Sequence, residues 1–192
     1  MKFNTQELIK ELSTAIISQQ QWMEREIQTL SEEELNWKAA PDSWSILECV
    51  EHLNRYAEFY LDKFEAKTKC GEETKSDVYQ SGWLGNYFAN SMLPKEGKVT
   101  NRMKTFSDKN PSGSNLTKKV LEVHQRDQER LVEILNDSSH LDFGKNRIPT
   151  TLGSWMKLKY GDALRFIINH IVRHYVQLHR IREGVEAAKQ AS

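Results

Sequence analysis

Apolar residues recur every three or four positions in four long stretches of the chain, which is the spacing of one face of an α-helix. These stretches run from Asn4 to about Leu30, from Ser45 to about Lys67, from about Asn115 to Leu135, and from about Asp162 to Gly184. We therefore expect four long helices, each with one face directed towards a common core.

Two S-x-x-E patterns mark helix starts. Ser45 precedes Glu48 by three residues, and Ser31 precedes Glu34 by the same distance. In such a capping box the serine and the glutamate each accept a hydrogen bond from a backbone N–H at the first turn. The patterns predict the start of the second long helix and a short extra turn before it.

Two long links separate these helices. The first link, residues 68–113, has a weak helical period, and a short helix is expected only at its apolar stretch from Trp83 to Leu93. The second link, from His140 to Tyr160, is expected to be irregular. Links of this length normally cross over a bundle or cover a site. The fold class predicted is all-α, a four-helix bundle with a long crossover connection, and residues 1–192 fit a single domain.

Composition limits the partners and the location. Lys plus Arg and Asp plus Glu both total 27, so the formal charge is zero and nothing favours binding to nucleic acid. No apolar run predicts a signal peptide or a membrane span. Cys49 and Cys70 are the only cysteines, too few for a disulfide framework, so we expect a cytoplasmic protein.

Three histidines stand out as candidate ligands. His170 and His174 are four residues apart on the expected inner face of the last helix, so their rings lie on one side of it. His52 lies on or beside the apolar face of the second helix. Together they could bind one divalent ion, although buried histidines satisfied by hydrogen bonds would give the same pattern.

Such a site would suit catalysis. Three imidazoles leave at least one coordination position open, as in catalytic zinc sites, where a bound water or thiolate can act as the nucleophile. Zinc, nickel, iron and copper all accept imidazole ligands, so the residues do not select among these metals.

The chain also resembles a known family. Four sequence patterns are similar to those of the DinB-like superfamily. They are Trp44-Ser-Ile-Leu-Glu-Cys-Val-Glu-His-Leu-Asn54, Arg147-Ile-Pro149, Gly161-Asp-Ala-Leu-Arg-Phe166 and His170-X-X-Arg-His174-X-X-Gln177. The resemblance implies a four-helix bundle, often a homodimer, with a divalent metal held at the positions of His52, His170 and His174.

The same resemblance suggests two chemistries. Relatives include proteins assigned as metal-dependent hydrolases, bacillithiol S-transferases and a mycothiol-dependent isomerase. It therefore implies a small-molecule substrate and an enzyme that activates water or a low-molecular-weight thiol cosubstrate, with S-transfer slightly preferred. A non-catalytic metal-binding or ligand-binding bundle is the alternative, and a dimerisation module with incidental histidines is a third.

Other polar residues have simpler interpretations. His124 lies on the inner face of the third helix and is expected to be a core histidine, with a role near the metal as the alternative. Glu48 is explained by its capping box, and Cys49 by burial. His140 and His179 are expected to lie outside the site.

Four aromatic residues could line a pocket beside the histidines, although core packing is the default interpretation of each. They are Trp44, Trp83, Trp155 and Tyr160.

Overall fold

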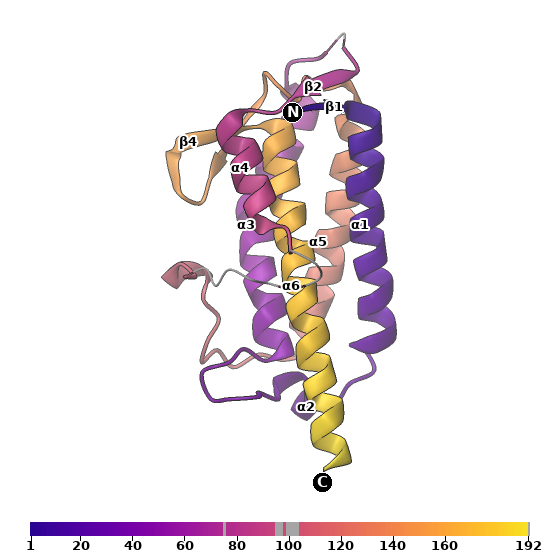
Figure 1. The fold of residues 1–192 in the computed structure, drawn as a ribbon, viewed down its shortest axis with the longest axis vertical. Coiled ribbons are helices and arrows are strands. Elements are labelled where there is room, and N and C mark those ends of the chain that lie inside the picture. Colours follow the sequence, from indigo (N-terminus) through magenta and orange to yellow (C-terminus); the bar gives the residue numbers. More distant parts are fainter. Residues whose placement is uncertain (75, 95–97, 99–103, 192) are drawn as a thin grey trace.

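Four long helices dominate the computed structural model, which describes residues 1–74, 76–94, 98 and 104–191 (Figure 1). They are α1 (Thr5–Glu26), α3 (Ile46–Cys70), α5 (Lys119–Asp137) and α6 (Tyr160–Gln190). The shorter helices are α2 (Glu32–Asn36), α4 (Trp83–Met92) and the 3-10 turns η1 (Ser107–Lys109) and η2 (Ser138–His140). The predicted all-α class is confirmed, as are the short turn before the second long helix and the short helix in the first link.

The connection between α3 and α5 crosses over the bundle. Figure 1 shows α3 and α5 running in one direction and α1 and α6 in the other, so the chain must return along the bundle between α3 and α5. Both α1 and α3 pack against α5 and α6, and α4 lies against α6. This arrangement brings the first half of α3 beside the middle of α6, where the candidate ligands lie.

Two small antiparallel sheets lie at one end of the bundle. One pairs β1 (Lys2–Asn4) with β2 (Val78–Gln80), and the other pairs β3 (Arg147–Thr150) with β4 (Gly153–Lys159). The second sheet corrects our expectation of an irregular link. Ile148 and Leu158 are paired and buried, and their neighbours along the strands are more exposed, so a short hairpin covers the core with one face.

Several predicted helix boundaries were wrong. The first long helix ends at Glu26 and not near Leu30. The third long helix begins at Lys119 rather than Asn115, since Leu116 packs against the core from the preceding turn. The last helix continues beyond Gly184 to Gln190. A methyl group on Gly184 would come within 2.8 Å of the Trp37 ring, so this glycine permits close packing instead of ending the helix.

The core fills the space between the long helices. Large side chains that are almost completely buried come from several elements: Ile16, Ile27, Ile46, Leu47, Tyr60, Leu61, Phe64, Leu131, Phe143, Tyr160 and Tyr175. At about 25 cal/mol for each Å² of apolar surface removed from water, this burial is the main force that holds the helices together. The described helices include none with the length and apolar character needed to cross a membrane.

Candidate metal centre

His52 of α3 and both His170 and His174 of α6 form one buried cluster. The Nε2 atom of His170 lies 3.3 Å from Nε2 of His52 and 3.1 Å from Nε2 of His174. One potential ligand atom from each of the three lies within 4.8 Å of the other two. The structure therefore brings together the three residues that the sequence singled out.

Hydrogen bonds orient two of these rings. The Nδ1–H of His52 donates to the carbonyl oxygen of Lys109 at 2.7 Å, and that of His174 donates to Oε1 of Gln177 at 3.1 Å. A proton on Nδ1 leaves the Nε2 of the same neutral ring with a free lone pair. Both free lone pairs thus belong to the nitrogens that face His170.

The donor set fits a divalent metal. A tetrahedral zinc ion with imidazole nitrogens at about 2.0–2.1 Å places neighbouring nitrogens about 3.3 Å apart, close to the two observed spacings of 3.1 and 3.3 Å. Without a cation, a single proton on His170 Nε2 would have to serve two acceptors. Nδ1 of His170 is buried and has no hydrogen-bond partner among the described residues.

Burial keeps the three imidazoles neutral. It lowers the pKa of His52 to about 4 and that of His174 to about 3, and it holds the pKa of His170 well below its usual range. Neighbouring rings and cations lower the pKa of His170 and His174 further. At neutral pH all three rings are in the form that binds metals.

Two aromatic rings border the cluster. The Trp44 ring centroid lies 4.8 Å from that of His52 and 6.0 Å from that of His174. The Tyr56 centroid lies 5.0 Å from that of His52 and 4.6 Å from that of His170. These rings restrict access of water to the imidazoles.

The other aromatic residues considered for the pocket lie elsewhere. Trp83 and Trp155 are 85% and 79% exposed, so they are neither core nor pocket residues. Tyr160 is fully buried and contacts Phe64 and Phe143. Of the four, Trp44 lies beside the histidine cluster, Tyr160 has the core position that was the default interpretation, and the two exposed tryptophans have neither.

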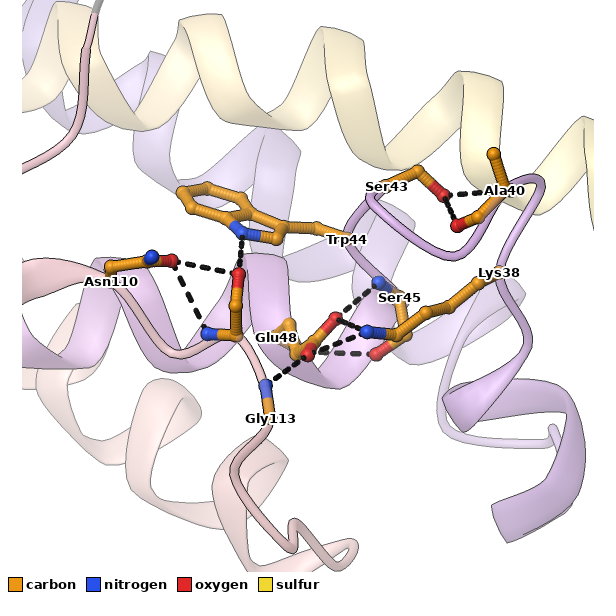
Figure 2. Close-up of polar contacts among 9 residues, drawn as sticks. Lys38, Ala40, Ser43, Trp44, Ser45, Glu48, Asn110 and Gly113 are labelled. Atoms are coloured by element: carbon orange, nitrogen blue, oxygen red, sulfur yellow. Dashed lines mark hydrogen bonds and ion pairs between the residues drawn. The ribbon is translucent and has the colours of Figure 1, made fainter.

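Glu48 ties the start of α3 to the crossover connection (Figure 2). Its carboxylate accepts hydrogen bonds from the backbone N–H of Ser45 at 3.0 Å and of Gly113 at 3.1 Å, and it pairs with the Lys38 ammonium at 2.7 Å. The Ser45 hydroxyl completes the predicted capping box by accepting from the Glu48 N–H. Glu48 is thus a structural residue that fixes the turn preceding His52.

The segment 107–114 of the crossover connection is fastened beside the cluster at further points. The Trp44 indole N–H donates to the Ser112 hydroxyl at 2.9 Å, and the Arg55 guanidinium donates to the carbonyl oxygen of Asn110 at 2.8 Å. Together with the bond from His52 to Lys109, these contacts place a loop against the ligand-bearing half of α3. No sequence pattern predicts this placement, because two of the three contacts use backbone carbonyl oxygens in an irregular segment.

His124 lies in a neighbouring polar network and not in the cluster. Its Nδ1 donates to Oδ1 of Asn54 at 3.0 Å, and its Nε2 accepts from Nε2 of Gln128 at 2.6 Å. The Gln128 amide also donates to the Tyr175 hydroxyl at 2.9 Å. Burial lowers the pKa of His124 to about 4, so it is a neutral, hydrogen-bonded core histidine, as preferred from the sequence.

The remaining candidates lie outside the cluster. The Cys49 thiol is fully buried and donates to the carbonyl oxygen of His174 at 3.8 Å, and burial raises its pKa, so it stays protonated and structural. His140 and His179 are exposed, as expected, and the His179 ring lies 3.9 Å from that of Trp22.

The fold and the cluster define a class: a crossover four-helix bundle with three buried histidines on two facing helices. Residues 16–178 match the model of the DinB superfamily, so the chain belongs to that superfamily and the resemblance seen in the sequence is confirmed. No curated protein and no solved structure matched the chain.

Proposed function

We propose that this protein is a metal-dependent enzyme in which His52, His170 and His174 bind one divalent ion that activates a small thiol or a water. The observation that carries the proposal is the convergence of three buried Nε2 atoms at spacings of 3.1 and 3.3 Å. Three protein ligands leave a coordination position for a reactant, as in catalytic zinc sites.

The bound metal would lower the pKa of the thiol or water that binds it and so supply a nucleophile at neutral pH. The protein's own groups prepare that position. The Lys109 carbonyl and Gln177 fix the rings of His52 and His174, while Trp44 and Tyr56 shield the cluster from bulk water. Shielding strengthens the attraction between a cation and an anionic nucleophile.

A second positive charge supports an anionic reactant. The Lys109 ammonium lies 6.0 Å from the centroid of the Tyr56 ring, which borders both His52 and His170. Its side chain is only 13% exposed, and it pairs with the largely exposed carboxylate of Asp108 at 3.4 Å. Such a charge favours a thiolate or a carboxylate-bearing substrate near the cluster. This agrees with the preference for thiol transfer that the family resemblance implies, with hydrolysis as the other activity to test.

The test uses purified protein loaded with zinc or nickel in two assays. The first measures consumption of a chromogenic electrophile in the presence of several small thiols, and the second measures hydrolysis of a chromogenic ester. Either activity should require the metal and disappear in His52→Ala, while His140→Ala keeps it. Metal binding without either activity, with unfolding on chelation, would instead favour a structural metal site. The homodimer, the cytoplasmic location and the single domain over residues 1–192 stay predictions.

A further inference from the structure

A small cavity lies directly beside the candidate metal centre. Its volume is about 20 Å³, and its lining includes His170 of α6, both Asp127 and Gln128 of α5, and Tyr56 of α3. A single water needs a cavity of roughly 10–15 Å³ and at least two polar partners. The cavity is therefore large enough for one water and too small for a substrate.

Two polar atoms without partners belong to residues that line this cavity. Among the described residues, three buried side-chain nitrogen or oxygen atoms lack a hydrogen-bond partner: Ser13 Oγ, Gln128 Oε1 and His170 Nδ1. The second and third belong to residues of α5 and α6 that both line this cavity. Leaving a buried polar atom unpaired costs about 1–3 kcal/mol, so one molecule that satisfies both atoms would be strongly favoured there.

The orientation of Gln128 is already determined by its other contacts. Its amide nitrogen donates to Nε2 of His124 at 2.6 Å and to the hydroxyl of Tyr175 at 2.9 Å. His124 in turn donates from Nδ1 to Asn54. Both amide protons of Gln128 are used, so its carbonyl oxygen is left as an acceptor for the cavity.

We infer that the cavity holds one ordered water that accepts a hydrogen bond from His170 Nδ1–H and donates one to Gln128 Oε1. Asp127 is a further polar residue that lines the same cavity. The water keeps the proton of His170 on Nδ1 and directs the Nε2 lone pair towards His52 and His174. Gln128 is then a positioning residue that acts on the third ligand through water.

The water would connect the polar network on α5 to the ring of His170. His52 and His174 are oriented directly, by Lys109 and Gln177, whereas His170 has no direct partner among the described residues. The water supplies the missing outer contact, and second-shell contacts of metal-binding histidines typically change metal affinity by about 10–100-fold. The Nδ1–H form of His170 and the positioning role rest on the proposed metal site, whereas the location of the water between His170 Nδ1 and Gln128 Oε1 does not.

The first test is a high-resolution crystal structure of the metal-free parent. It should show a water within hydrogen-bond distance of both His170 Nδ1 and Gln128 Oε1. A dry cavity, or a water bonded to neither atom, would overturn the inference. Nitrogen-15 NMR of the histidine rings adds a second measurement: His170 should carry its proton on Nδ1 in the zinc-loaded parent, and a proton on Nε2 would contradict the proposed arrangement.

The second test is zinc affinity, measured by competition with a chromophoric chelator. Gln128→Leu removes the acceptor and should weaken binding about 10–100-fold. Gln125→Leu, on the exposed face of the same helix, is the matched control and should bind as the parent does. Unchanged affinity in Gln128→Leu would rule out the positioning role.

These measurements separate the two proposals. A parent that binds no zinc would refute the proposed function, and the crystal structure would still decide whether the water is present. If Gln128→Leu does not fold, the parent structure and the NMR tautomer of His170 decide the inference without that variant.

Discussion

The Nδ1 atom of His52 lies 2.7 Å from the carbonyl oxygen of Lys109, so the crossover connection fixes the orientation of a ring on α3. A backbone carbonyl accepts the Nδ1 proton and leaves Nε2 free, a common outer contact of metal-binding histidines. The loop and the cluster are therefore parts of one structure, and changes in either should affect metal binding.

Replacement of a single ligand should remove the metal without unfolding the protein. His52→Ala deletes one of three donors, and we expect its zinc affinity to fall by more than the roughly 10–100-fold typical of second-shell changes. Zinc at 100 times Kd should add about 2.7 kcal/mol to the free energy of unfolding of the parent. Its melting temperature should therefore rise with zinc, and that of the variant should not. His140→Ala, an exposed histidine, should behave like the parent. Equal stabilisation of His52→Ala by zinc would exclude His52 as a ligand.

Glu48→Gln should destabilise the protein in a pH-dependent way. Burial of Glu48 opposes its ionisation, but hydrogen bonds from Lys38, Ser45 and Gly113 outweigh burial and lower its pKa below 4.5. A carboxyl whose pKa is lowered by folding stabilises the native state above its unfolded pKa, and this stabilisation is lost as the pH falls through the folded value.

We therefore expect Glu48→Gln to lose about 1–3 kcal/mol of unfolding free energy at pH 7, with the difference from the parent shrinking below pH 4.5. Urea unfolding at several pH values measures this. Glu58→Gln, exposed on the same helix, serves as the control and should cost little at any pH. A constant loss across the pH range would show that the charge of Glu48 is not responsible.

Trp44 should report metal binding by its fluorescence. Its ring lies 4.8 Å from that of His52, whereas Trp155 is 79% exposed on β4. Copper or nickel bound to the cluster quenches a nearby indole, so Trp44→Phe should lose most of the quenching seen in the parent and Trp155→Phe should keep it. The reverse pattern would place the bound metal away from the histidine cluster.

Gly85→Ala should destabilise α4 even though alanine favours a helix by about 1 kcal/mol over glycine. A methyl group at Gly85 would lie 2.3–2.5 Å from the buried side chain of Asp162 on α6, closer than atoms can approach. Overpacking of this kind typically costs about 1–3 kcal/mol. Thermal unfolding should show a lower melting temperature, and Leu84→Ala on the exposed side of α4 should show almost none of this loss. A stabilised Gly85→Ala would mean that α4 does not pack closely on α6.

The helices and the inward positions of His52, His170 and His174 were predictable because they depend on local periodicity. Spacings of three and four residues predict that His170 and His174 lie on the buried side of α6. The capping box of Ser45 and Glu48 marks where α3 begins, and the apolar spacing from there predicts that His52 faces the core. The hairpin of β3 and β4 was missed, because its alternation of buried and exposed residues is short and its turn lacks a strong signal.

The surroundings of the ligands could not be predicted in the same way. The contacts of His52 with Lys109 and of Glu48 with Gly113 join residues more than 50 positions apart through backbone groups, which leave no mark on side-chain periodicity. The shared cavity of His170 and Gln128 depends on how α5 and α6 both pack against α3. Such features arise from tertiary packing and need coordinates.

The central claim is that His52, His170 and His174 together bind one metal ion. The most direct measurement is metal content by elemental mass spectrometry on protein purified without chelators or a histidine tag, for the parent and the His170→Ala/His174→Ala double variant. We predict about one metal per chain in the parent and none in the variant, with helical content retained in both. Absence of metal from the parent after reconstitution with zinc and with nickel, or equal metal in the folded variant, would contradict the claim.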